Sequence, residues 1–231
     1  MLYRADFHVH SCLSPCASLE MSPDAIVRKA KEVGLNALAL TDHNCGFNLP
    51  AFAKICERRG MECLYGMEVT SMEEAHILCL FDDLESALEM GALVYDSLPD
   101  VPNQPDRFGD QPIIDENEEI LGFADKFLIS ASGFDIGSLV ERVHALDGLI
   151  IPAHIDRMVY GVIAQLGFLP AENFDAVELT ARGDPALALG YPIIRNSDSH
   201  DLGGLGSAHT DYELESLTVN HLRKVLEQRR A

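Results

Sequence analysis

The sequence has few basic residues. Its 17 Lys and Arg face 37 Asp and Glu, which gives a formal net charge of −20 over 231 residues. This balance argues against a protein that coats nucleic acid, for which a basic surface is expected. It does not exclude an enzyme for a negatively charged substrate, because divalent cations in a carboxylate-lined pocket would reverse the local field.

Long apolar runs are also missing. No run approaches the ~20 residues of a membrane span, and residues 1–6 contain no apolar segment of signal-peptide length. We therefore expect a cytoplasmic protein that does not contact membrane. Its six cysteines are scattered without zinc-finger spacing, so in a reducing compartment we expect mostly free thiols. The oligomeric state is left open.

Apolar runs alternate with helical patterns along the chain. The runs predict strands over residues 3–10, 35–40, 61–69, 76–81, 149–154, 174–180 and 192–197. The helical patterns cover residues 22–34, 48–60, 84–98, 135–147, 158–166 and the tail from 216. This alternation is typical of an α/β fold with mostly parallel pairing. The length suits a single domain over residues 1–231, with an irregular excursion and a short hairpin at about 99–130.

Two histidines lie one residue apart near the start of the chain, His8 and His10. On a strand they would point to the same face, because side chains alternate with period two. Such a pair can form two arms of a metal site. Alone the pattern is weak, since two hydrogen-bonded histidines on a half-buried strand would look the same.

Further polar residues recur where the predicted strands end. In parallel α/β folds, functional groups collect at the carboxyl ends of the strands. The residues at such ends are His10, Asp42, His43, Glu68, His154, Asp198 and His200. His76 is the exception, because it falls at the beginning of its strand. Unrelated core histidines would not share one edge.

The chemistry of this set favours a metal centre. Imidazole nitrogen mixed with carboxylate oxygen suits zinc, manganese or iron better than magnesium. The candidates are too many for one ion, so we expect two or three divalent ions with bridging carboxylates. Closely spaced ions can share the charge of a phosphoryl group and activate a bound water as the catalytic nucleophile. Taken singly, each residue also has a structural explanation, as a hydrogen-bonded core histidine or a turn-capping carboxylate.

The ordered motifs HVHS, TDHN, GME, His76, PAH and SDSH together resemble the PHP (polymerase and histidinol phosphatase) family, from residue 3 to about residue 210. The resemblance implies a distorted, TIM-like (β/α)7 barrel with a trinuclear metal centre and metal-dependent phosphoesterase activity. It also implies three groups of ligands. They are His8, His10, Glu68 and Asp198 for one ion, Glu68, His76 and His154 for a second, and His43 with His200 for a third.

One position departs from the family pattern. Many members have an acid or a histidine five or six residues after the histidine pair, where this chain has Pro15 and Cys16. Cys16 is either a soft thiolate ligand or a small buried loop cysteine. We expect Asp6 and Asp42 to be outer partners that accept hydrogen bonds from metal-binding imidazoles, with ordinary strand-edge carboxylates as the alternative.

A phosphate substrate also needs positive side chains. Arg157 and Arg182 follow the predicted strands on the ligand edge, and a guanidinium group binds phosphate in a bidentate manner. The alternative for both is a solvated surface charge. His144, His209 and His221 are expected to be structural.

These features favour a phosphohydrolase acting on a small phosphate ester. A nuclease on single-stranded nucleic acid is the second hypothesis, although the acidic composition argues against nucleic acid other than a short substrate. A degenerate metal-binding module is the third, although such a module would be expected to lose ligands. Histidinol phosphate phosphatase is a narrower possibility that nothing in the sequence selects.

Overall fold

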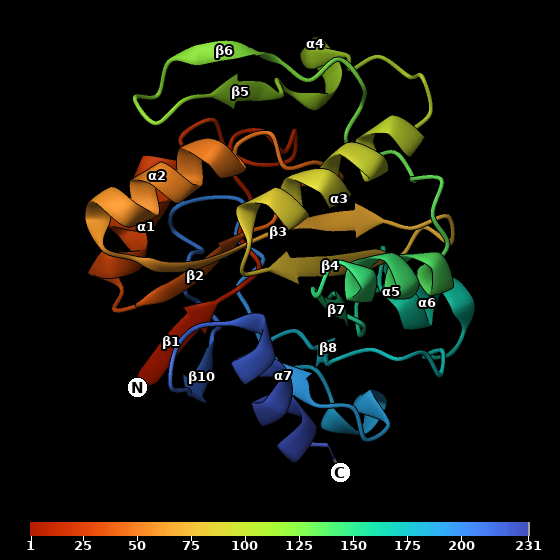
Figure 1. The fold of residues 1–231 in the computed structure, drawn as a ribbon. Coiled ribbons are helices and arrows are strands. Elements are labelled where there is room, and N and C mark those ends of the chain that lie inside the picture. Colours follow the sequence, from red (N-terminus) through yellow and green to blue (C-terminus); the bar gives the residue numbers. More distant parts are fainter. Residues whose placement is uncertain (231) are drawn as a thin grey trace.

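Six strands form the central sheet of the computed structural model, which describes residues 1–230 (Figure 1). Ala231, the last residue of the expected 1–231 domain, lies outside the described residues. The sheet order is β10-β1-β2-β3-β4-β7. These strands are β10 (Thr210–Glu213), β1 (Leu2–Asp6), β2 (Ala37–Leu40), β3 (Glu62–Thr70), β4 (His76–Phe81) and β7 (Leu149–Pro152).

The pairing in this sheet is mixed. β1 pairs with β2 and β2 with β3 in parallel, whereas β3–β4, β4–β7 and β1–β10 are antiparallel. The prediction of mostly parallel pairing is therefore wrong for this sheet. Only residues 71–75 separate β3 from β4, and a parallel crossover needs roughly a dozen residues or more. The chain must turn back on itself at this point.

The sheet curls towards closure through two short strands, β8 (Val177–Glu178) and β9 (Ile193–Ile194), which pair in parallel. The amide of Ile155 donates to the carbonyl of Glu178 and joins β8 to the end of β7. A bridge between Val9 and Ser199 joins the segments that follow β1 and β9. The result is an α/β distorted barrel, as predicted.

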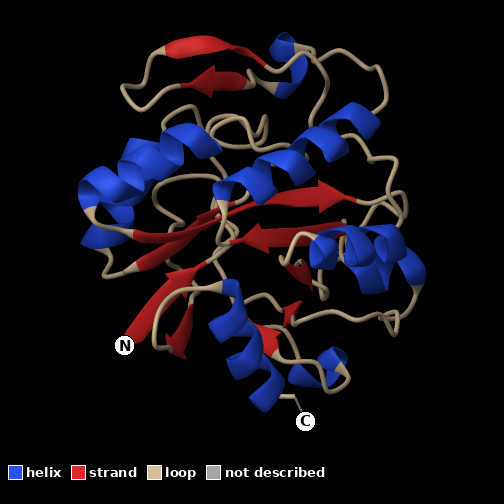
Figure 2. Cartoon of the chain, viewed as in Figure 1, coloured by secondary structure: helices blue, strands red, loops and turns tan. Residues whose placement is uncertain are grey.

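The strands are buried on both faces. Leu38 and Leu40 of β2 pack into the core beneath the helices, whereas Ala37 and Ala39 face the barrel interior. Figures 1 and 2 show helices around the sheet and a C-terminal helix beside β10. They are α1 (Pro23–Glu32), α2 (Leu49–Arg59), α3 (Leu84–Ser97), α5 (Ile136–Ala145), α6 (Val162–Leu166) and α7 (Val219–Gln228), with a 3₁₀ turn η1 (Pro185–Ala188). No helix among residues 1–230 is long and apolar enough to span a membrane.

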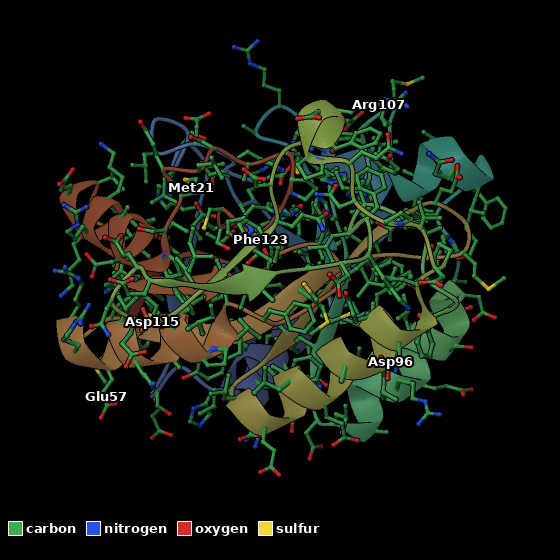
Figure 3. The ribbon with its side chains drawn as sticks, turned by 90° about the horizontal axis from the view of Figure 1, so that it is seen from above. Met21, Glu57, Asp96, Arg107, Asp115 and Phe123 are labelled. Atoms are coloured by element: carbon green, nitrogen blue, oxygen red, sulfur yellow. The ribbon has the colours of Figure 1, made fainter. Side chains whose placement is uncertain are left out.

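The excursion after α3 forms a separate small layer. It contains α4 (Pro105–Phe108) and the antiparallel hairpin β5 (Pro112–Ile114) and β6 (Ile120–Phe123). Figure 3 looks onto this hairpin, with Phe123 on it. The hairpin is tied to the barrel by Asn48, which does not cap α2 with its side chain. Asn48 instead accepts from the Ile114 amide at 3.0 Å and donates to Ser11 Oγ at 3.1 Å.

Several predicted elements are shorter in the structure. The first strand ends at Asp6 rather than at residue 10, and the strands over 174–180 and 192–197 shrink to β8 and β9. The helix expected from residue 158 begins at Val162, because the chain turns through a bend at residues 158–160. A β-carbon at Gly161 would lie only 2.3 Å from the Arg157 carbonyl oxygen, so this turn requires glycine.

Candidate metal centre

The predicted ligands converge at one edge of the barrel. His8 and His10 follow β1, His43 follows β2, Glu68 lies near the end of β3 and His154 follows β7. His76 begins β4, and because β4 runs antiparallel to β3 its first residue lies opposite Thr70 at the same edge. The exception in the sequence pattern is thus explained by strand direction.

One group of side chains consists of His8, His10, Glu68 and Asp198. His8 Nε2 lies 3.2 Å from His10 Nε2, 3.2 Å from Glu68 Oε1 and 3.1 Å from Asp198 Oδ1. His10 Nε2 lies 3.2 Å from Asp198 Oδ1 and 3.3 Å from Glu68 Oε2. Ligand atoms of a tetrahedral zinc ion are about 3.3 Å apart, given Zn–N bonds of about 2.0–2.1 Å. The spacing therefore fits a metal ion.

Glu68 is the centre of the arrangement. Its Oε1 lies 2.9 Å from His76 Nδ1 and 3.0 Å from His154 Nε2. Its Oε2 lies 3.2 Å from His43 Nδ1. Both oxygens of one buried carboxylate thus face imidazoles from different strands, which is the arrangement that a carboxylate between two ions requires.

Two further groups combine His10 with His43 and His200, and His43 with Glu68 and His76. His154 belongs to none of the groups found among residues 1–230, although its Nε2 contacts Glu68. The His10 and His200 rings stack with centroids 4.2 Å apart. Cys16 lines the adjacent cavity but belongs to none of the candidate ligand groups found among residues 1–230. Cys16 as a residue is exposed rather than buried, so its description as a small buried loop cysteine is wrong, and its role as a thiolate ligand stays a prediction.

Unpartnered polar atoms and backbone strain gather at this edge. Among the described residues, eight buried side-chain polar atoms lack a hydrogen bond, and four of them are His43 Nδ1, His76 Nε2, His154 Nδ1 and Asp198 Oδ1. His154 and Asp198 also adopt left-handed backbone, with φ of 29° and 50°. Such conformations cost on the order of 1–3 kcal/mol and persist where the surroundings enforce them. Two of the four unpartnered atoms face other predicted ligands, since His43 Nδ1 lies 3.2 Å from Glu68 Oε2 and Asp198 Oδ1 lies 3.1 Å from His8 Nε2, and a bound cation would satisfy both. The unpartnered nitrogens of His76 and His154 are the ones that do not face Glu68.

The orientation of His8 is set by Glu178 on β8. His8 Nδ1 donates to Glu178 Oε2 at 3.0 Å, which leaves Nε2 to face the cluster. Glu178 also accepts from Asn196 Nδ2 at 2.7 Å and from the His154 amide at 2.9 Å. One buried carboxylate therefore fixes two histidines of the cluster, as outer partners of metal ligands do.

His10 is oriented through a hydroxyl group. Its Nδ1 lies 3.0 Å from Ser14 Oγ, and Ser14 Oγ donates to Asp42 Oδ1 at 2.7 Å. Asp42 thus acts on His10 through Ser14 and not directly. Asp6 accepts from the amides of Ser197 and Gly206. Among residues 1–230, neither aspartate hydrogen-bonds to an imidazole, so the expectation of direct contact is wrong for both.

The sequence analysis missed Glu178 and Ser14. Glu178 lies within the apolar run FDAVELT, and a lone carboxylate in a buried strand is a signal that could have identified it, because an unpaired buried charge is costly. Ser14 gave no comparable signal.

The pKa values of His8 and His10 are both raised. Burial opposes protonation of His8, but the carboxylates of Asp198, Glu178 and Glu68 outweigh burial and raise its pKa well above 6.5. Burial opposes protonation of His10 as well, and hydrogen bonds to Asp198 and Glu68 raise its pKa to about 9. In the absence of metal, these two imidazoles hold protons that a bound cation must displace.

Burial has the opposite outcome elsewhere in the cluster. It lowers the pKa of His43 well below 6.5 and, with repulsion from His10, lowers the pKa of His200 to about 4. These neutral imidazoles can donate lone pairs to a metal. Although Cys16 is exposed as a residue, partial desolvation of its thiol beside the cavity raises the pKa of this thiol to about 12, and the negative charge of Glu68 adds to this effect.

A cavity of about 240 Å³ opens onto the cluster. Arg157 lines it and pairs with Asp198 at 2.5 Å. Arg182 is exposed and does not line this cavity. The turn before Arg182 is held by Asp156, which accepts from the amide and hydroxyl of Thr180. The structure therefore brings only one of the two predicted arginines to the site. His144, His209 and His221 lie outside the candidate ligand groups.

The chain belongs to the PHP domain family, whose model matches residues 6–158. This confirms the resemblance noted in the sequence. A 63-residue stretch is 40% identical to DNA polymerase III subunit alpha of Halalkalibacterium halodurans, which is 27% of this chain and 6% of that subunit. The chain thus spans only a small part of this relative.

Solved structures share the fold. The lesion-specific endonuclease PfuEndoQ of Pyrococcus furiosus superposes with a TM-score of 0.74 at 20% identity, over 99% of this chain and 56% of that one. Endonuclease Q has also been solved with a 27-mer duplex that carries an abasic lesion at the active site (TM-score 0.72, 20% identity, 99% and 57% of the two chains). A protein of Bifidobacterium adolescentis, provisionally named a metal-dependent phosphoesterase, superposes with a TM-score of 0.62 at 18% identity over 98% and 96% of the two chains.

Proposed function

We propose that this chain is a metal-dependent phosphohydrolase that cleaves a phosphate ester with water at a di- or trinuclear centre. The observation that carries the proposal is the position of Glu68. Its two carboxylate oxygens contact imidazoles of His43, His76 and His154 at 2.9–3.2 Å, in a family whose name joins polymerases with a phosphatase.

The ligand assignment is the one that the family resemblance implies, and it differs in one member from the candidate groups of the described residues, which place His43 rather than His154 with Glu68 and His76. His8, His10, Glu68 and Asp198 would hold one ion. Glu68, His76 and His154 would hold a second, with Glu68 shared between the two. His43 and His200, close to His10, would hold a third, with Cys16 beside them. Zinc, manganese and iron all accept this mixture of nitrogen and oxygen.

The remaining groups have roles in binding and orientation. When bound, the ions would neutralise phosphoryl charge and supply a water of lowered pKa. Arg157 would hold the phosphate in a bidentate manner. Its guanidinium group lies 2.5 Å from the Asp198 carboxylate. A bound phosphate would therefore replace this carboxylate as the anionic partner of Arg157. Glu178 and Ser14 would keep the His8 and His10 rings in place.

A nuclease is the second candidate, and the likeness to Endonuclease Q favours it. The solved complex of that enzyme contains duplex DNA. This chain, however, covers only 56–57% of the solved endonuclease chains. Its net charge of −20 opposes association with a polyanion. We therefore rank a small phosphate ester above a nucleic acid as the substrate.

The test uses protein purified without chelator, followed by reconstitution with zinc, manganese or iron. We expect at least two equivalents of transition metal, and phosphate release from at least one member of a panel. The panel contains simple phosphomonoesters, histidinol phosphate, cyclic phosphodiesters and short single-stranded DNA. His76→Ala should lose metal, whereas His221→Ala, outside the cluster, should retain it. Fewer than one equivalent of metal after reconstitution would overturn the proposal, and cleavage of DNA alone would favour the nuclease.

A further inference from the structure

The cavity beside the metal centre has a wall that phosphate chemistry does not require. Ile129, Val159 and Tyr160 line it together with Arg157 and the predicted ligands, and the accessible wall is largely apolar. Phosphate and metal ions make no use of apolar surface. Small-molecule sites commonly combine such a surface with a few polar groups that fix orientation.

The apolar wall is open to an incoming molecule. Val159 is 63% exposed in a chain whose composition is strongly acidic. Ile129 and Tyr160 are partly exposed. Apolar and aromatic side chains around a concave site that also holds a few polar groups are the usual lining of a small-molecule pocket.

The wall is also preformed. The carbonyl of Tyr160 accepts a hydrogen bond from the His76 amide at 2.9 Å. The Tyr160 ring stacks on the His76 ring with centroids 4.2 Å apart and an interplanar angle of 6°. Tyr160 has a φ of 58°, a left-handed conformation that non-glycine residues rarely adopt. The backbone is therefore fixed in a strained form that places this aromatic ring beside a predicted metal ligand.

We propose, resting on the proposed function, that the substrate is a phosphomonoester of a compact apolar or aromatic alcohol. The phosphate would lie between Arg157 and the metal centre, and the alcohol would contact Ile129, Val159 and Tyr160. Water adds to phosphorus, the phosphorus–oxygen ester bond breaks, and the alcohol leaves with a proton while inorganic phosphate forms. A cavity of about 240 Å³ limits the alcohol to a compact group.

The test compares benzyl phosphate with glycerol phosphate on the metal-loaded protein. Both esters release an alcohol whose oxygen is bonded to a saturated carbon, so the benzyl ester does not have the better leaving group that an aryl phosphate would have. We expect kcat/KM to be about tenfold or more higher for benzyl phosphate, as apolar pockets discriminate by this order. Calorimetry with benzylphosphonate and 2,3-dihydroxypropylphosphonate, which are not hydrolysed, measures the same preference as a ratio of Kd values.

Two variants locate the preference on the wall. Val159→Thr replaces a methyl group by a hydroxyl group at nearly constant volume. It should reduce the benzyl-to-glycerol ratio of kcat/KM by about threefold or more, by loss of buried apolar surface. Met158→Thr introduces the same residue on the same loop, by a larger truncation, at a position that is 86% exposed and does not line the cavity. This control should keep the ratio of the parent protein.

Each outcome decides one proposal. A benzyl preference in turnover and binding that Val159→Thr weakens and Met158→Thr preserves supports the inference. Equal kcat/KM and equal Kd values for the two pairs overturn it and leave the phosphohydrolase intact. Absence of turnover of every ester in the panel overturns the proposed function, and the phosphonate Kd ratio then decides by itself whether the wall selects apolar groups.

Discussion

Glu178 provides the sharpest test of how the metal centre is held, because its carboxylate accepts three hydrogen bonds and a glutamine cannot accept them all. The donors are His8 Nδ1, Asn196 Nδ2 and the His154 amide. In Glu178→Gln the single carbonyl oxygen can take the place of either Oε1 or Oε2. The side-chain NH2 group must then face the Asn196 amide or the His154 amide, donor against donor.

The magnitude follows from this count. One buried donor left without an acceptor costs about 1–3 kcal/mol of unfolding free energy, and in a chain of this size about 1 kcal/mol corresponds to a Tm change of about 2–4 °C. Loss of an outer partner typically lowers metal affinity by about 10–100-fold. We therefore expect Glu178→Gln to fold with a lower Tm and to bind its metal about 10–100-fold more weakly.

The assay is a competition titration of metal-depleted protein against a chromophoric chelator, with thermal unfolding measured in parallel. Glu213→Gln is the matched control, since Glu213 is an exposed residue of β10 and its replacement changes the net charge by the same amount. Metal affinity in Glu178→Gln equal to that of the control would show that Glu178 does not position His8. A lower Tm with unchanged affinity would give Glu178 a structural role only.

Four further predictions concern the cluster and its cavity. Glu68→Gln should lower turnover by a factor on the order of 100 or more with folding retained, and near-normal turnover would show that Glu68 is misassigned. Arg157→Ala should raise the KM for phosphate esters at unchanged metal content, whereas Arg182→Ala should keep the KM of the parent protein. A parental KM in Arg157→Ala would show that Arg157 does not bind the phosphate. Cys16→Ala should lose one equivalent of metal if the thiolate is a ligand, and unchanged stoichiometry would refute ligation. Metal affinity should rise from pH 7 to about 9, by up to about tenfold per pH unit for one released proton. The reason is that the pKa of His10 without metal is about 9, so the metal must displace the His10 proton below this pH. A metal affinity that does not change over this range would contradict the competition between metal and proton.

Much of the site could be predicted because its residues end or begin regular elements. The motifs around His43, Glu68 and His154 follow apolar runs, and the runs are strands whose ends meet. Asp198 could be named from its motif alone, because its strand β9 has only two residues. Its left-handed backbone and its contact with Arg157 depend on packing between distant segments, which no local pattern encodes.

The outer partners were harder to predict than the ligands. Asp42 was selected because it precedes a histidine, yet it reaches His10 through Ser14, a residue between the two in sequence. Glu178 meets His8 across 170 residues of chain. A hydrogen bond of this kind depends on the closure of the barrel, and sequence spacing carries no information about which strands become neighbours there.

The position of His76 shows that the direction of β4 was predicted wrongly, although the ligands still meet at one edge of the sheet. With parallel pairing throughout, a histidine at the start of a strand would lie at the opposite edge from Glu68, too distant for contact. The 71–75 turn is too short for a crossover, so β4 runs back along β3 and places His76 Nδ1 2.9 Å from Glu68 Oε1. β7 then runs antiparallel to β4, which returns its carboxyl end, and His154, to the same edge. Two successive reversals therefore preserve the gathering of ligands that a parallel barrel would produce, and the same reversals bring Tyr160 onto the His76 ring, where the wall of the cavity begins.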